Sequence, residues 1–138
     1  MTSSITTAAT QLSGRVLMSV IFITAGIGKI GAYTGTQGYM ESMGVPGVLL
    51  PLVIALEVGA GIAVLIGWQT RISAFMLAGF SVLSALIFHA DFGDQMQSIL
   101  FMKNLAMAGG LLLLVANGAG GWSLDARQRS MSGGLQHA

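Results

Sequence analysis

The chain has 138 residues, of which 54% are hydrophobic and 8% are charged, with a formal net charge of +1 and a mean hydropathy of +0.78. A soluble domain carries about 25% charged residues, so this composition excludes a soluble globular fold and indicates an integral membrane protein. The small net charge does not indicate a nucleic-acid-binding surface. The absence of cysteine excludes a disulfide, a thiol redox centre and an iron–sulfur ligand set.

The first part of the chain predicts one membrane helix followed by a surface segment. Residues 1–11 carry no basic residue, unlike a secretory signal peptide, so we interpret them as an N-terminal tail. The apolar stretch after them predicts a helix over residues 12–30 that stays in the mature protein. The Gly-rich loop that follows contains residues 39–43, which we expect to form a short amphipathic helix at the membrane surface.

Three further apolar stretches complete the predicted bundle. They predict helices over residues 46–67, 71–89 and 97–117, each close to the ~20 residues that a bilayer requires. Residues 118–125 close the membrane domain, which we place at 12–125, and residues 126–138 read as a flexible cytoplasmic tail. The predicted fold class is therefore all-α, a bundle of four transmembrane helices.

The arginines predict the orientation of this bundle. An even number of helices puts both termini on one side, and that side collects all four arginines. Asp91 and Asp94 fall in the turn on the other side. The positive-inside rule then predicts a multi-pass membrane protein with both termini in the cytoplasm and the acidic turn outside.

Polar residues within the predicted helices fall at related depths. At ~1.5 Å per helical residue, Lys29 lies about 21 Å from Arg15, and Lys103 lies equally far from Asn117. Glu57 falls about 16 Å from the turn at Trp68, near the midplane. His89, eighteen residues after Arg71, falls about 27 Å from it, at the outer interface. Four helices thus send polar groups to one region in the outer half of the membrane.

Glu57 is the most informative of these residues. A carboxylate near the bilayer centre costs at least ~2.5–3.5 kcal/mol on insertion scales, so it should face the bundle and be paired or protonated. Two interpretations remain open. Glu57 either handles protons in a ligand cavity, or forms a structural ion pair with Lys29 or Lys103 that fixes the register of the helices.

The remaining candidates concern a ligand. Two lysines against one buried glutamate leave an excess positive charge, which indicates an anionic or quinone-like ligand, or a lysine that snorkels outwards. His89 at the outer interface either relays protons or hydrogen-bonds a neighbour. The candidate catalytic residues are Glu57 and His89, and the candidate ligand-binding residues are Lys29, Lys103 and Asn104. The sequence predicts no metal site, because His89 and Asp91 lack further ligands. A quinone ring is expected among Phe22, Phe88 and Phe101.

Several motifs in order resemble the DoxX family of small bacterial membrane proteins. The resemblance covers residues 12–125 and rests on FITAGIGK (22–29), EVGAGIA (57–63), GWQTR (67–71), FH (88–89), KNLAMAGG (103–110) and WSLD (122–125). It implies a four-helix inner-membrane protein, and some relatives are tied to membrane redox complexes, including thiosulfate:quinone oxidoreductase.

Three functional hypotheses follow. In the first, the chain is a subunit of a membrane redox or detoxification system that binds a quinone-like or small anionic molecule and works with a membrane or soluble redox partner. In the second it carries a small molecule or ion, and in the third it helps to assemble another membrane protein. The lack of cysteine argues against autonomous redox catalysis, so enzyme activity is left open, as is homo-oligomerisation.

Overall fold

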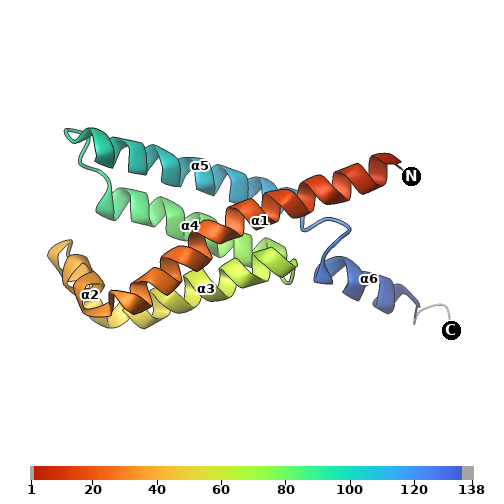
Figure 1. The fold of residues 1–138 in the computed structure, drawn as a ribbon, viewed down its shortest axis with the longest axis horizontal. Coiled ribbons are helices and arrows are strands. Elements are labelled where there is room, and N and C mark those ends of the chain that lie inside the picture. Colours follow the sequence, from red (N-terminus) through yellow and green to blue (C-terminus); the bar gives the residue numbers. More distant parts are fainter. Residues whose placement is uncertain (1, 135–138) are drawn as a thin grey trace.

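The computed structural model describes residues 2–134, and within them the protein is a bundle of α-helices with no strand (Figure 1). The long helices are α1 (Thr2–Gly31), α3 (Leu50–Ile66), α4 (Thr70–Phe88) and α5 (Gln95–Asn117). The short elements are α2 (Tyr33–Ser42), the 3₁₀ turn η1 (Gly47–Leu49) and α6 (Leu124–Gly134). Four segments of the described chain are long and apolar enough to cross a membrane, which confirms the predicted all-α membrane bundle. They are Ser4–Gly31, Gly47–Ile66, Thr70–Phe88 and Gln95–Asn117.

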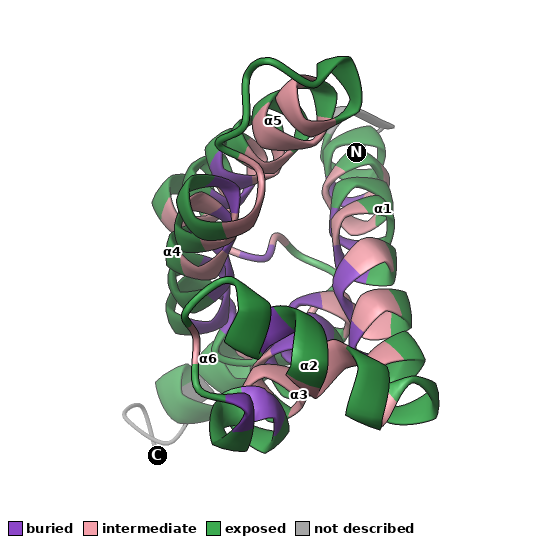
Figure 2. Ribbon diagram, turned by 90° about the vertical axis from the view of Figure 1, so that its left-hand side faces the viewer, coloured by how far each residue is buried: buried purple, intermediate pink, exposed green. Residues whose placement is uncertain are grey.

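The bundle is built from two helix pairs. Helix α1 packs mainly on α3, α4 packs mainly on α5, and α3 joins the pairs through α4, while α1 and α5 make few contacts (Figure 2). Small residues allow the first pair to approach closely, as they do between membrane helices in general. A Cβ on Gly26 of α1 would lie 2.6 Å from Val58 Cγ2 of α3, and one on Gly61 of α3 would lie 2.9 Å from Ile23 Cγ1.

The two ends of the bundle differ in what they carry. One end, the termini end, holds the start of α1, the α3–α4 turn, the segment 118–123 and α6, and both termini lie there (Figure 1). The other end, the turn end, holds α2 and the turn 89–94 between α4 and α5. Val64, Leu77 and Leu111, all fully buried, form the core between the ends.

The prediction that residues 1–11 form a tail outside the first helix was wrong for the residues described. Helix α1 begins at Thr2, ten residues before the predicted start, and its first turns are held by tertiary contacts. Ala8 is 8% exposed, beside Gly121, and Gln11 lies against Gly120, so the segment after α5 supports this extension. The sequence pattern misled us because few of these residues are strongly apolar.

The predicted flexible tail at residues 126–138 is likewise helical through Gly134, and residues 135–138 lie outside the described part. Two local features start α6. The Ser123 hydroxyl accepts a hydrogen bond from the Ala126 N–H at 3.1 Å, and Asp125 places a negative charge in the first turn. The predicted surface helix at 39–43 is present as α2, which starts earlier, at Tyr33.

Candidate functional site

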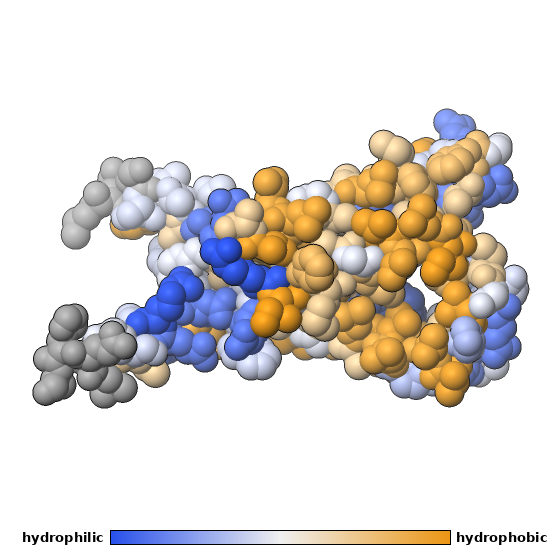
Figure 3. Space-filling view, turned by 180° about the vertical axis from the view of Figure 1, so that it is seen from behind, coloured by the Kyte–Doolittle hydropathy of each residue, from blue (hydrophilic) through white to orange (hydrophobic). Residues whose placement is uncertain are grey.

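A cavity of about 450 Å³ lies inside the turn end of the bundle. Residues from all four long helices and from α2 line it, and most of them are apolar. Seen from behind, the surface is hollowed near this end, among mainly hydrophobic residues (Figure 3). Its polar lining consists of Lys29, Thr36, Glu57, Ser84, His89, Lys103 and Asn104. The structure therefore brings together all five residues that the sequence singled out as catalytic or ligand-binding candidates.

Lys29 and Glu57 meet because the glycine contacts set the register of α1 on α3. Gly26 lies directly against residues 57 and 58, and Lys29 follows it by one helical turn. The Lys29 ammonium nitrogen lies 2.8 Å from Glu57 Oε2 and 3.0 Å from Oε1. The Glu57 side chain is 5% exposed and the Lys29 side chain is 27% exposed. The predicted ion pair is therefore present, with Lys29 as the partner of Glu57.

Lys103 is the second lysine of the cavity, and it is not part of this ion pair. Lys103, Asn104 and Met107 lie at helical spacing on the face of α5 that lines the cavity. Among residues 2–134 the Lys103 ammonium has no hydrogen-bond or ion-pair partner, and the residue is exposed. The Asn104 amide donates 2.9 Å to the Leu100 carbonyl of its own helix, which leaves its carbonyl oxygen available to the cavity.

His89 and a pair of aromatic rings line the cavity near the α4–α5 turn. His89 Nδ1 lies 2.7 Å from Gln97 Oε1, across the turn from the start of α5. Tyr39 of α2 stacks on Phe88 of α4, with ring centroids 5.5 Å apart and an interplanar angle of 30°. Sequence reasoning placed Tyr39 on the membrane surface and missed its role in the cavity, because only the tertiary fold lays α2 over this end.

One aromatic assignment was wrong. Phe101 does not line the cavity but meets Phe92 edge-on, with centroids 4.9 Å apart. The side chains of α5 that face the cavity are at 100, 103, 104 and 107, and residue 101 is turned by about 100° from residue 100. Phe22 and Phe88 line the cavity as expected, together with Phe80, which the sequence reasoning did not select.

The acidic turn has a structural role. Asp94 caps α5 by accepting hydrogen bonds from the N–H groups of Met96 at 2.7 Å and Gln97 at 3.2 Å. Asp91 accepts one from the Gly93 N–H and is exposed outside the cavity. Among the described residues, no three His, Asp or Glu side chains come close enough together to hold a metal ion.

At the termini end two arginines cap helices. Arg15, 1% exposed, donates to the carbonyls of Val64 at 3.4 Å and Leu65 at 2.9 Å, near the end of α3, and also to the Trp122 carbonyl. Arg71 donates to the carbonyls of Val115 and Ala116 at 2.8 and 3.0 Å, at the end of α5. The sequence used these residues only as topology markers, since their partners are backbone atoms far away in the chain.

Asp125 completes this end by capping α4. Its carboxylate oxygens accept the N–H groups of Gln69 at 2.8 Å and Thr70 at 3.0 Å, and its own N–H donates to the Gly67 carbonyl. Burial pushes the pKa of the Asp125 carboxyl upwards, but the contacts with Thr70 and Gln69 and the charge of Arg129 outweigh it, so the pKa is lowered. The GWQTR (67–71) and WSLD (122–125) motifs are thus hydrogen-bonded to each other.

The fold and this cavity define an integral membrane protein of four spanning helices with a mostly apolar cavity that holds a few polar groups. Comparison with known proteins identifies the family. A model of the DoxX family matches residues 10–90. The inner membrane protein YqjF of Escherichia coli (strain K12) is 54% identical over 114 residues, which are 83% of this chain and 88% of that protein. The inner membrane protein YphA of the same organism is 37% identical over 123 residues, 84% of this chain and 88% of that protein.

The chain therefore belongs to the DoxX family and is an inner membrane protein. The resemblance seen in the motifs is confirmed. No solved structure gives a significant match to it.

Proposed function

We propose that the cavity at the turn end binds a quinone-like or small anionic molecule, and that the protein serves as a subunit of a membrane redox or detoxification system. The observation that carries this proposal is the gathering of Lys29, Glu57, His89, Lys103 and Asn104 around one otherwise apolar cavity. Small-molecule sites are commonly cavities of about 300–1,000 Å³ with a mostly apolar lining and a few convergent polar groups, and this cavity has the same features.

The charges of the cavity favour a ligand with a negative or strongly accepting oxygen. Lys29 and Glu57 neutralise each other, so Lys103 leaves the cavity with one net positive charge. A lone ammonium beside apolar surface is costly to desolvate, and a carbonyl, phenolate or carboxylate oxygen would offset that cost. A flat ring would pack against Phe22, Phe80 and Phe88 while its oxygen accepts from Lys103.

The proton-handling groups lie at two depths of the same cavity. A quinone takes up two electrons and two protons on reduction to the quinol, and the electrons would come from a redox partner. His89 would exchange protons with water, and Glu57, ionised beside Lys29, would take up a proton and pass it on within the site. Lys29 would thereby act on the ligand through Glu57.

Binding is favoured over passage across the membrane. Val64, Leu77 and Leu111, each 0% exposed, fill the bundle between the cavity and the termini end. Beyond them Arg15 is tied to three backbone carbonyls. A carrier would need this region to open, whereas a binding subunit needs only the turn end.

A short-chain quinone titration of the purified protein in detergent, followed by thermal unfolding, tests the proposal. We expect the quinone to raise the melting temperature of the wild type, and Lys103→Met and His89→Ala to lose most of that rise. Arg127→Gln is the matched control, because it removes one positive charge on α6, outside the cavity. Equal rises in all four proteins would mean that the quinone acts through the detergent, and the proposal would be dropped.

We further propose that both termini face the cytoplasm, so that the cavity lies in the outer half of the membrane. The four arginines of the chain all lie at or near the termini end, where the positive-inside rule places them in the cytoplasm. Cysteine in place of Asp94 should react with an impermeant thiol reagent in intact cells, and cysteine in place of Gln128 should not. The reverse pattern would overturn this orientation.

A further inference from the structure

A second cavity, of about 490 Å³, lies at the termini end, far from the ligand cavity. It is bounded by the first turn of α4, residues 118 and 119, and one side of α6. Two arginines line it from different elements, Arg71 on α4 and Arg129 on α6, and the Gln128 amide lies beside them. Asp125 is the acidic group in the lining, so the pocket carries a net positive charge.

The two arginines of this pocket keep hydrogen-bond donors that no group in the described part of the chain accepts. Asp125 already accepts the N–H groups of Gln69 and Thr70, so the start of α4 offers no free donor at these positions. Arg71 donates through Nη1 to two carbonyls, which leaves its Nε and Nη2 without a hydrogen-bond partner among residues 2–134. The charge of Arg129 acts on Asp125, but its guanidinium donates no hydrogen bond and forms no close ion pair within the same residues, so all of its donors are available.

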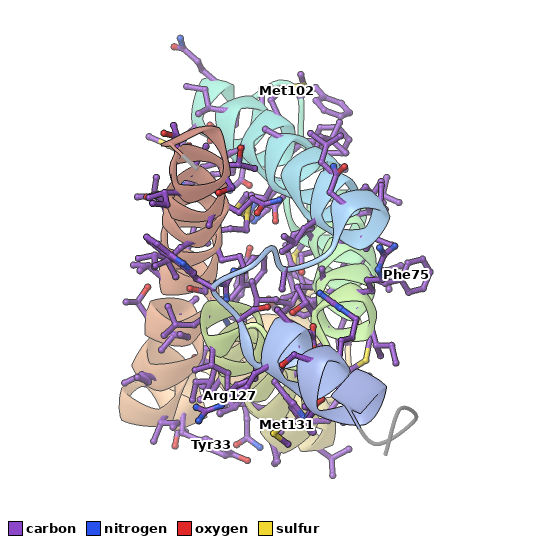
Figure 4. All side chains as sticks on the ribbon, turned by 90° about the vertical axis from the view of Figure 1, so that its right-hand side faces the viewer. Tyr33, Phe75, Met102, Arg127 and Met131 are labelled. Carbon is purple, nitrogen blue, oxygen red and sulfur yellow. The ribbon has the colours of Figure 1, made fainter. Side chains whose placement is uncertain are left out.

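The pocket lies where lipid headgroups meet the protein. Trp68 and Trp122, 46% and 51% exposed, lie close to it in the chain, and tryptophan concentrates at membrane–water interfaces. Ile72, 61% exposed, lines the pocket, and Phe75, 62% exposed, continues the apolar surface along α4 (Figure 4). A polar pocket with two guanidinium groups thus opens beside a lipid-facing helix surface.

We propose that this pocket binds the phosphodiester group of an anionic phospholipid. The planar guanidinium groups of Arg71 and Arg129 would donate to the phosphate oxygens, with the Gln128 amide as a third donor. An acyl chain would run along α4 past Ile72 and Phe75. Because α6, the 118–119 segment and α4 all border the pocket, the bound lipid would fasten α6 to the bundle. A free phosphate ion shares the headgroup chemistry.

Lipid binding to the full-length protein in neutral detergent tests this proposal. Phosphatidylglycerol, which is anionic, phosphatidylcholine, which is zwitterionic, and inorganic phosphate are titrated separately, with binding followed by native mass spectrometry and thermal unfolding. Arg129→Gln is the test variant. Arg127→Gln is its control, because Arg127 carries the same charge two residues away on the side of α6 that faces away from Phe75 (Figure 4) and does not line the pocket.

We expect phosphatidylglycerol to bind the wild type and Arg127→Gln alike, and Arg129→Gln at least about tenfold more weakly, as for the loss of one charge-assisted hydrogen bond. Inorganic phosphate that binds with the same dependence on Arg129 would support the phosphate site and identify a soluble source. Equal weakening by both substitutions would mean diffuse attraction to a basic surface and would overturn the proposal. The proposal would also be overturned if phosphatidylglycerol bound no better than phosphatidylcholine and inorganic phosphate did not bind. Since the ligand cavity lies at the opposite end, neither result bears on the quinone proposal.

Discussion

The two ends of the bundle each hold a positively charged side chain, but in different surroundings. At the termini end Arg15 is 1% exposed and surrounded by carbonyl oxygens that end α3 and the 118–123 segment. At the turn end Lys103 lines a cavity of about 450 Å³ with no partner among the described residues. Both are single cations in a chain of low charge, but one is satisfied by the fold and the other is not.

This difference separates structural polar groups from candidate binding groups. A buried polar group that finds its partners within the protein stabilises one arrangement of the helices, as Arg15, Arg71 and Asp125 do here. A polar group that faces a cavity without a partner is available to a ligand. The Lys29–Glu57 pair lies between these cases, because its charges are paired and it also lines the cavity. Four substitutions test the contrast.

The largest effect is expected for Arg15→Met. The substitution removes the Arg15 donor from the carbonyls of Leu65 and Trp122, while the Val64 carbonyl keeps the Gly67 N–H at 3.2 Å. Each buried unsatisfied group costs about 1–3 kcal/mol. We therefore expect the free energy of unfolding to fall by about 3 kcal/mol or more. Thermal or denaturant unfolding in detergent measures this, and Arg127→Met on exposed α6 should leave stability almost unchanged. A similar loss in both variants would mean that α1 is not fastened through Arg15.

Removal of the acid alone from the ion pair should have the next largest effect. Glu57→Leu leaves the Lys29 ammonium beside an apolar cavity, and loss of one partner of a buried pair costs about 3–5 kcal/mol. Since Lys29 is partly exposed, we expect a loss nearer about 2 kcal/mol. The double variant Lys29→Met/Glu57→Leu should regain most of it. If Glu57→Leu alone is as stable as the wild type, the pair does not hold α1 to α3.

A smaller effect is expected at the cap of α4. Asp125→Ala should cost about 1 kcal/mol, as for the loss of a helix N-cap. Because folding lowers the pKa of Asp125, this contribution is complete above the unfolded pKa of about 3.9 and is lost as the pH falls through the lower folded value. The stability difference between wild type and Asp125→Ala should therefore be constant from pH 7 to 5 and shrink below pH 4. A difference that grows on acidification would contradict the lowered pKa.

The smallest effect on stability is expected for Lys103→Met. The ammonium has no protein partner to lose, so we expect a change within about 0.5 kcal/mol in either direction. Its effect should appear in ligand binding, as the quinone titration measures. A loss of stability comparable to that of Arg15→Met would show that Lys103 has a structural partner after all, and would remove the contrast between the two ends.

Much of the turn end could be predicted because membrane helices are regular. A fixed rise per residue converts the positions of Lys29, Glu57 and Lys103 into depths, and the cost of charge in lipid turns all three towards the bundle. The same regularity did not identify Phe101 correctly, since its orientation on α5 depends on how that helix is rotated against α4. Tyr39 was missed because the position of α2 over the cavity is a tertiary property.

The sequence by itself determined that this protein lies in a membrane, that four helices cross it, and that a few polar groups share one level of the bundle. Composition and hydropathy are sufficient for this, because lipid excludes unpaired charge and irregular backbone. Only the tertiary structure decided that Glu57 pairs with Lys29 and leaves Lys103 over, because the choice depends on the close glycine contact of α1 with α3. It alone also decided that Arg15 and Arg71 cap helices, since their partners are backbone carbonyls, which every residue carries and no sequence pattern marks.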